Sequence, residues 1–198
     1  MSTAVSYKSV SELRQSIIEP NAGWSEKMLH AVPKMDVVKD RAAYLVESAK
    51  GKVVLDIGCT GAISKQIRLA AKTYYGVDKE AADGVVAVDI DHRPDQIPVY
   101  EGVETVIMSE VLEHLANPGY FLAVLKKLYP ANVFVLTVPN AGAFSMKGEC
   151  EVVHHDHVSW YSYTTLKALV TRYGYSIKYA AWYNGVPYKA EGLIMVLT

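Results

Sequence analysis

From Lys52 to the C-terminus, short apolar runs alternate with segments of helical periodicity. The runs suit buried strands because they are brief, rich in Val, Ile and Tyr, and bounded by Gly, Asp or Pro. They cover residues 52–58, 74–78, 84–90, 105–111, 132–139, 175–183 and 192–198, and the helical segments between them cover residues 63–73, 119–129 and 164–174. Strands that alternate with helices in this way predict an α/β fold, with a doubly wound sheet and helices on both faces.

The segment before this alternation is predicted to be helical. Over residues 35–49 apolar side chains recur at helical spacing: Val37, Val38, Ala42, Leu45 and Val46. Ser11 has the position of an N-cap for an earlier helix. We therefore expect an N-terminal helical extension, residues 1–50, followed by an α/β domain, residues 51–198.

Charge and cysteine usage limit the class of partner and the compartment. The net charge is −1 and no cluster of Lys or Arg stands out, so the electrostatic footprint of a nucleic-acid-binding protein is missing. The only cysteines, Cys59 and Cys150, imply no disulfide framework. No run approaches the roughly 20 apolar residues of a membrane span. These features predict a cytoplasmic protein that acts on a small molecule without membrane contact, and they leave its oligomeric state open.

A glycine-containing turn and two later carboxylates suggest a nucleoside site. Gly58 and Gly61 lie between the first predicted strand and the helix after it, where glycine lets the backbone approach a ligand. Asp78 ends the next strand, about 20 residues on, the spacing of a carboxylate that binds ribose hydroxyls. Asp89 ends the following strand, where it can bind an adenine amino group. Each feature alone has a packing or helix-capping explanation, but the three together favour a nucleoside.

Taken in order, these motifs resemble the class I S-adenosyl-L-methionine (SAM)-dependent methyltransferases. The resemblance rests on VVLDIGCTG (53–61), YYGVD (74–78), VAVDI (86–90), VIMSEVLEHLANP (106–118), FVLTVPN (134–140) and HHDHVSWYSYTTLKALVTRYGYSI (154–177). It implies a Rossmann-like, seven-stranded sheet with an antiparallel last strand, and a lid formed by the N-terminal helices. It also implies that the methionine part of SAM lies near Asp56, Gly58 and Gly61, the ribose on Asp78, the adenine by Asp89 and Ile90, and the backbone of Met108 and Ser109 alongside.

The turn departs from the usual Asp-x-Gly-x-Gly-x-Gly pattern of this family. The stretch DIGCTGA (56–62) is one residue shorter and lacks the middle glycine. A SAM-binding protein without catalytic activity therefore remains an alternative to an enzyme.

Two groups of polar side chains should converge beside the methyl donor. Glu110, Glu113 and His114 stand at i, i+3 and i+4, on one face of a helical turn, and His157 closes the stretch HHDH (154–157). Both groups follow strands that are neighbours in a class I sheet, at the edge where ligands bind. Carboxylates and imidazoles together can hold a divalent ion. A solvated surface turn is the alternative for the first group.

Two branches of the family sharpen this hypothesis. The pair SEVLEHL (109–115) and HHDHVSW (154–160) resembles the metal-dependent small-RNA 3′-terminal 2′-O-methyltransferases, which implies that Glu110, Glu113, His114 and His157 hold a metal. Ubiquinone-type O-methyltransferases show a similar Glu-x-x-Glu-His pattern. Sugar and natural-product O-methyltransferases instead imply one histidine as a general base without metal, here His157 or His114.

The combined prediction is a SAM-dependent O-methyltransferase of a small hydroxylated acceptor such as a sugar, natural product or catechol-like diol. A divalent metal (Mg, Mn, Fe or Zn) would assist it in the metal-dependent version. Methylation of an RNA terminus is a second alternative. Trp160, Tyr161 and Tyr163 are close enough to the histidines in the sequence to shape the acceptor pocket.

Overall fold

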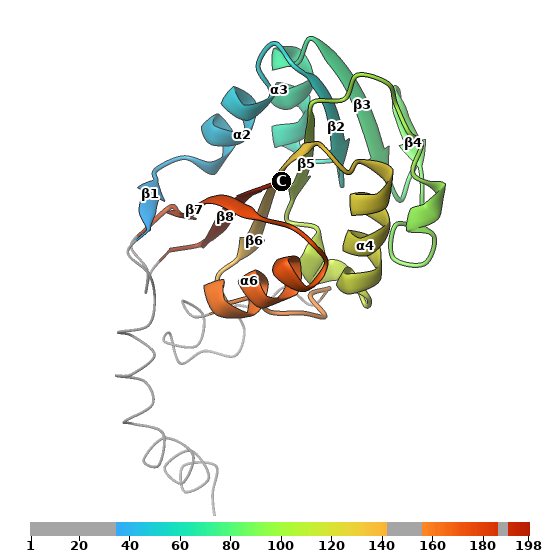
Figure 1. Cartoon of the computed structure of the whole chain (residues 1–198). Helices are drawn as coiled ribbons and strands as arrows, with labels where there is room; N and C mark the ends of the chain where they lie inside the picture. Colours follow the sequence, from blue (N-terminus) through green and yellow to red (C-terminus); the bar gives the residue numbers. More distant parts are fainter. Residues whose placement is uncertain (1–34, 142–155, 186–189) are drawn as a thin grey trace, which may run out of the picture. The chain divides into compact units, whose positions relative to one another are not determined.

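The computed structural model describes residues 35–141, 156–185 and 190–198, and a mixed sheet runs through the whole of this part (Figure 1). Its eight strands lie in the order β1-β7-β8-β6-β5-β2-β3-β4. All neighbours pair in parallel except β8, which is antiparallel to both β6 and β7. The strands are β1 (Asp36–Val38), β2 (Val53–Ile57), β3 (Thr73–Asp78), β4 (Val85–Ala87), β5 (Thr105–Ser109), β6 (Val133–Pro139), β7 (Ile177–Tyr183) and β8 (Gly192–Leu197). The predicted α/β sheet with an antiparallel last strand is confirmed.

The eighth strand, β1, corrects the prediction of a helix over residues 35–49. Asp36–Val38 pairs in parallel with β7, and helix α2 begins only at Arg41. The Asp40 carboxylate accepts a hydrogen bond from the backbone N–H of Ala43 at 3.0 Å, which makes Asp40 the N-cap. The prediction therefore began the helix too early. Val37 and Val38 fit the helical spacing, but as β-branched residues they suit an edge strand equally well.

Helices cover both faces of the sheet, as a doubly wound fold requires. Figure 1 shows α2 (Arg41–Ala49) and α3 (Ala62–Ala70) on one side, and α4 (Pro118–Leu128) and α6 (Tyr163–Arg172) on the other. Two single-turn 3-10 helices, η1 (Pro94–Gln96) and η2 (Leu112–His114), follow β4 and β5. Among the described residues, no helix is long and apolar enough to cross a membrane.

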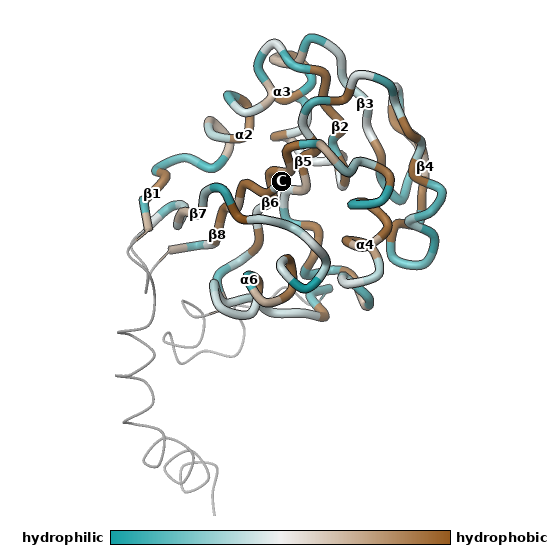
Figure 2. Tube along the Cα trace, in the orientation of Figure 1, coloured by the Kyte–Doolittle hydropathy of each residue, from teal (hydrophilic) through white to brown (hydrophobic). Residues whose placement is uncertain are grey.

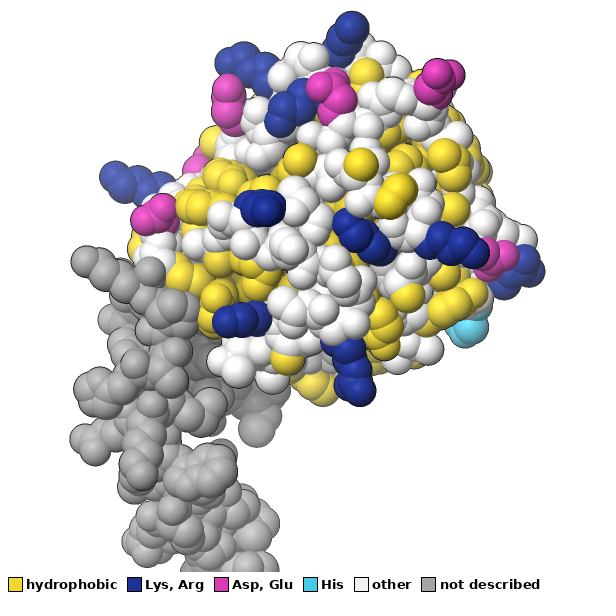
Figure 3. Space-filling model, in the orientation of Figure 1, with side chains coloured by type: hydrophobic (Ala, Val, Ile, Leu, Met, Phe, Trp, Pro, Cys, Tyr) yellow, Lys and Arg dark blue, Asp and Glu magenta, His cyan; other side chains and the backbone are white. Residues whose placement is uncertain are grey.

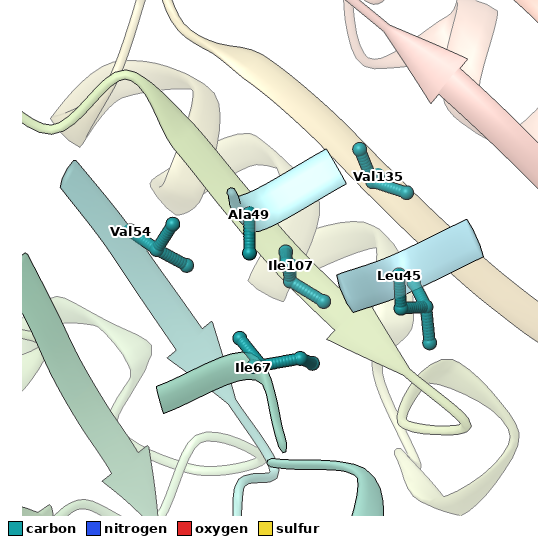
Figure 4. Packing of buried hydrophobic residues seen from close by; sticks show 6 residues of the cluster. All are labelled: Leu45, Ala49, Val54, Ile67, Ile107 and Val135. Atoms are coloured by element: carbon teal, nitrogen blue, oxygen red, sulfur yellow. The ribbon is translucent and has the colours of Figure 1, made fainter. Parts of the chain in front are cut away.

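Alternate side chains of the central strands build a core on each face. A cluster beneath α2 and α3 comprises Leu45, Ala49, Val54, Ile67, Ile107 and Val135 (Figure 4). On the opposite face the Phe134 ring packs edge-on against Tyr175 at a centroid distance of 5.0 Å, and the Tyr175 hydroxyl donates to the carbonyl of Leu122 in α4. Hydropathy along the chain follows this plan, with brown apolar segments along the inner strands in Figure 2. Because helices cover both faces of the sheet, a ligand can reach the sheet only at the ends of its strands.

All described residues belong to one unit that begins at Met35. Residues 36–49, which were predicted to belong to the N-terminal extension, form β1 and α2 of this unit. Residues 1–34, including the predicted cap Ser11, lie outside the described residues, and the lid stays a prediction.

Candidate functional site

A cleft of about 400 Å³ opens where β2, β3 and β5 end. This volume lies within the range of small-molecule sites, about 300–1,000 Å³. The walls come from the segments that follow four strands: Gly58, Asp78, Lys79, Asp89, Ile90, Asp91, His92, Glu110, Val111, His114, Leu115 and also Asp156. Four of the eight residues predicted to bind the cofactor, Gly58, Asp78, Asp89 and Ile90, thus line a single cleft.

Gly58 begins the turn after β2 in a conformation that favours glycine. Its φ is +76°, and its backbone N–H donates to the carbonyl of Val77 at 2.9 Å. A Cβ built on Gly58 would lie 2.6 Å from Cγ2 of Val111, which also lines the cleft. Gly61 instead is the N-cap of α3 and lines a second, smaller hollow with Cys59, Thr60 and Ser64.

Replacing Gly58 by Ala should destabilise the fold by roughly 1–3 kcal/mol, for two reasons. The positive φ is strained for alanine, and the new methyl group would collide with the Val111 side chain. Gly61→Ala is the matched control, since Gly61 has a φ of −79° and a Cβ added there would meet no heavy atom within 4 Å. It should cost less than about 1 kcal/mol. Urea denaturation of both variants would measure the difference, and equal stability would contradict this role of Gly58 in the turn.

Asp78 ties the shortened turn to the end of β3. One carboxylate oxygen accepts from the backbone N–H of Thr60 at 3.1 Å, and the other from the N–H of Lys79 at 2.6 Å. Two carboxylate oxygens can accept about four hydrogen bonds, so capacity for a ligand's hydroxyl groups remains on the side that lines the cleft. The loss of the middle glycine therefore leaves both the turn and Asp78 at the cleft.

Asp89 lies at another part of the cleft wall and is paired with His92, a residue that was not predicted from the sequence. Both carboxylate oxygens lie near Nδ1 of His92, at 3.2 and 3.1 Å, and these hydrogen bonds lower the pKa of Asp89. The next carboxylate, Asp91, accepts from the backbone N–H groups of Ala116 and Asn117 and so connects this wall to the start of α4. The sequence offers one signal for Asp91 and His92: both follow the predicted Asp89 in the loop at the end of a strand.

The other predicted cofactor residues, Asp56, Met108 and Ser109, are not among the residues that line the cleft. Asp56 is 1% exposed and accepts from the Tyr74 hydroxyl at 3.0 Å, and burial raises the pKa of this carboxyl to about 6. Met108 is fully buried, and the Ser109 hydroxyl lies 3.2 Å from the Thr137 hydroxyl. A contact of these residues with a cofactor stays a prediction.

Beside the cleft, the structure brings Glu113, His114 and His157 together. One ligand atom from each of the three lies within 4.8 Å of the others. The rings of His114 and His157 have a centroid distance of 4.8 Å and an interplanar angle of 82°. His114 also lines the cleft, so the cluster and the cleft share a wall. His154 and His155 lie outside the described residues.

Backbone contacts hold the two halves of this cluster against each other. The N–H groups of Val158 and Ser159 both donate to the carbonyl of Glu113, at 2.8 and 3.1 Å. The Tyr161 hydroxyl donates to the carbonyl of Leu112 at 3.3 Å, so Tyr161 is buried beneath η2 and not free to shape an acceptor pocket. Trp160 as a whole is 54% exposed. The segment that carries His157 is therefore fixed on the turn that carries Glu113 and His114.

Glu113 has the most unusual environment in the cluster. It is 1% exposed, and neither carboxylate oxygen has a hydrogen-bond partner among the described residues. Burial, followed by the negative charge of Glu110, raises the pKa of Glu113 to about 8. A buried carboxyl without a partner is unfavourable unless a cation or a proton compensates it. Two imidazoles next to such a carboxylate form a donor set that fits a divalent transition metal.

Glu110, predicted as a fourth ligand, lies on the cleft wall but not in this cluster. Its Oε1 forms an ion pair with Nη1 of Arg41 at 3.0 Å. The same carboxylate accepts hydrogen bonds from the hydroxyls of Thr137 at 2.8 Å and Tyr183 at 3.2 Å. Neither Arg41 nor Tyr183 was predicted from the sequence, since no motif connects them with Glu110.

The sequence profile of a family described as a methyltransferase domain matches residues 28–179. No curated protein matches the chain. Among solved structures, the small RNA methyltransferase HEN1 is similar over 79% of this chain and 24% of its own, with a TM-score of 0.60 and 17% identity, so the chain spans about a quarter of that protein. The methyltransferase domain of the bacterial protein CtHen1-C shares 18% identity at a TM-score of 0.59, covering 80% of this chain and 96% of its own.

A further similar structure is 1,6-didemethyltoxoflavin-N1-methyltransferase of Burkholderia thailandensis, with bound 1,6-didemethyltoxoflavin and S-adenosylhomocysteine. It shares 12% identity at a TM-score of 0.59, over 100% of this chain and 92% of its own.

Proposed function

Because this chain belongs to the methyltransferase domain family and has the fold of SAM-dependent methyltransferases, we propose that it methylates a hydroxyl group of a small acceptor with two neighbouring oxygens, assisted by a divalent metal ion. One observation carries the proposal. The buried carboxylate of Glu113, without a hydrogen-bond partner among the described residues, lies together with the imidazoles of His114 and His157, and His114 lines the cleft. A hydroxyl acceptor needs help to lose its proton, and this cluster can supply that help.

The residues that line the cleft suggest where each part of the cofactor would bind. Asp78 would bind the ribose hydroxyls, and Asp89 with Ile90 would border the adenine, since all three line the cleft. The backbone of Gly58 allows close approach because no side chain intervenes. SAM supplies a methyl group on a positively charged sulfur, so the protein's contribution is mainly to align donor and acceptor.

Glu113, His114 and His157 would hold the metal ion. A carboxylate with two imidazoles suits Mn²⁺, Fe²⁺ or Zn²⁺, and Mg²⁺ to a lesser degree. A bound ion lowers the pKa of a coordinated hydroxyl, as it does for water. The chain's own contribution is to fix these ligands through the contacts of Val158 and Ser159 with Glu113, and to keep His114 at the cleft wall.

Charge distribution favours a small acceptor over nucleic acid. The net charge is −1, and on the face in Figure 3 the Lys and Arg side chains are scattered singly rather than gathered. The ribose at an RNA end carries the same pair of neighbouring oxygens, and the likeness to small RNA methyltransferases makes it the second candidate. Binding to an RNA oligonucleotide that weakens steeply with salt would favour that candidate.

His157→Ala should lower kcat/KM for methyl transfer from labelled SAM by at least about 100-fold, whether His157 acts as a ligand or as a base. Catechol and a ribonucleoside with a free 2′,3′-diol are suitable first acceptors. EDTA should remove activity and Mn²⁺ should restore it. Val158→Ala is the control and should retain activity, because Val158 lies in the same segment and is 54% exposed.

Activity that survives EDTA but not His157→Ala would assign His157 as a base without metal. A fully active His157→Ala variant would contradict both versions of the proposal. SAM binding without turnover on any diol would favour the non-catalytic alternative.

A further inference from the structure

We propose that Arg41 is a positioning residue that holds Glu110 away from the metal, so that only Glu113, His114 and His157 bind the ion. The inference rests on the proposed metal-assisted function and specifies the ligand set of that site. It departs from the four-ligand set expected from the sequence motifs, because one of the expected ligands has other partners in this chain.

The Glu110 carboxylate is already engaged by three side chains. Nη1 of Arg41 lies 3.0 Å from Oε1, and the Thr137 hydroxyl donates to the same oxygen at 2.8 Å. The Tyr183 hydroxyl lies 3.2 Å from both carboxylate oxygens. The side chains of Arg41 and Glu110 are 23% and 25% exposed, so water screens this ion pair only in part. Recruiting Glu110 to a metal would require breaking a charge-assisted contact and two hydrogen bonds.

The groups that hold Glu110 are themselves fixed. Thr137 is fully buried in β6 and its hydroxyl also contacts Ser109. Tyr183 is 3% exposed, and its ring occupies the space above Gly192, where any Cβ would collide with the Tyr183 hydroxyl. The Arg41 guanidinium lies over the same ring, 5.2 Å from its centroid. Arg41 therefore completes a rigid arrangement built from α2, β6 and β7.

The backbone conformation of Glu110 also supports this orientation of its side chain. Its φ is +57°, a region that residues other than glycine seldom adopt, and its N–H donates to the carbonyl of Thr137 at 3.0 Å. Such conformations persist where the surrounding structure enforces them, often at functional sites.

The ion pair between Arg41 and Glu110 affects the charge and the number of ligands at the neighbouring metal site. With Arg41 in place, the cluster offers one carboxylate and two imidazoles and leaves more coordination positions for acceptor oxygens. Without Arg41, Glu110 would be an unpaired negative charge beside the ion, held only by the hydroxyls of Thr137 and Tyr183, and it would be easier to recruit as an additional oxygen ligand. Both changes favour tighter binding of a cation, and an added oxygen ligand favours harder ions such as Mg²⁺ and Mn²⁺.

The test is calorimetric titration of the metal-free full chain with Mn²⁺ for wild type, Arg41→Gln, Glu110→Gln, the double variant and Glu113→Gln. We expect Glu110→Gln to stay within about threefold of wild type, while Glu113→Gln loses at least about 100-fold, because loss of a direct ligand should cost no less than the roughly 10–100-fold typical of residues that only orient the ligands. Arg41→Gln should bind about tenfold more tightly, and the double variant should lose that gain. If Arg41→Gln does not fold, Tyr183→Phe removes a Glu110 donor without a charge change and should show a smaller gain.

The outcomes separate this inference from the proposed function. Glu110→Gln as damaging as Glu113→Gln, or Arg41→Gln no tighter than wild type, would overturn the role of Arg41 while leaving metal binding in place. A wild-type protein that binds no Mn²⁺ would overturn the metal-assisted function and the inference with it.

Discussion

Glu113→Gln should strongly weaken metal binding and remove the contribution of Glu113 to the pH dependence of stability. The substitution keeps the size of the side chain but removes the only carboxylate of the Glu113–His114–His157 cluster. Affinity for Mn²⁺ should fall by at least about 100-fold, because an amide oxygen is a weak ligand and cannot neutralise the ion. Methyl transfer in the metal-assisted mechanism should fall with it. A Glu113→Gln variant that binds Mn²⁺ as wild type does would show that the ion binds elsewhere.

Stability of the metal-free protein gives an independent view of the same group. The pKa of Glu113 is raised from its ordinary value of 4.5 to about 8, so the folded protein keeps a proton that the unfolded chain has released. The stabilisation is complete below about pH 4.5 and is lost as the pH rises through about 8, at up to about 1.4 kcal/mol per pH unit. Glu113→Gln lacks this titration, so its stability relative to wild type should increase over that interval. Denaturation curves of the two proteins at several pH values would measure the difference, and parallel profiles would contradict the buried state of Glu113.

Metal binding should show the opposite pH dependence. The ion needs a deprotonated carboxylate and neutral imidazoles, so binding at pH 7 should release protons. The Mn²⁺ affinity of wild type should therefore increase with pH and level off only above about pH 8, the pKa of Glu113, where most of its carboxyl groups have lost the proton. Calorimetry in buffers of different ionisation enthalpy would count the released protons.

Asp78→Ala should weaken binding of S-adenosylhomocysteine by about 1.5–3 kcal/mol, the range for lost hydrogen bonds to a charged group, or roughly 10–150-fold. Asp78 lies on the cleft wall at the end of β3, where the ribose is expected. The carboxylate also accepts from the Thr60 N–H and so supports the shortened turn. Asp78→Asn is the matched variant, because its amide oxygen can still accept that bond. Its affinity should lie between wild type and Asp78→Ala in a calorimetric titration, and an unchanged affinity for Asp78→Ala would refute the ribose assignment.

The sheet and the convergence of the cluster could be predicted because both follow from local patterns. Brief apolar runs between helices specify the doubly wound sheet, and neighbouring parallel strands carry Glu113, His114 and His157 to one edge. The end of a helix is less well specified, so β1 was missed where Val37 fits a helix and a strand alike. The local signal that did mark the true helix start is Asp40, an N-cap residue before Arg41.

The direction of Glu110 could not be predicted, because it depends on contacts between distant parts of the chain. Tyr183 follows Glu110 by 73 residues, and Arg41 lies in the segment that was predicted to form a separate extension. Helical spacing placed Glu110 and Glu113 on one face, but only η2, residues Leu112–His114, is helical, and Glu110 precedes it with a positive φ. Tertiary contacts therefore decide which of two similar glutamates faces the cluster.

The central claim is that the cofactor cleft and the cluster of Glu113, His114 and His157 form one active site. Anomalous diffraction from crystals grown with S-adenosylhomocysteine and Mn²⁺ tests it most directly. We expect the cofactor product in the cleft on Asp78 and a manganese peak coordinated by these three side chains, with Glu110 still bound to Arg41. Cofactor bound in the cleft with no manganese at the cluster, or with His157 turned away from it, would contradict the claim.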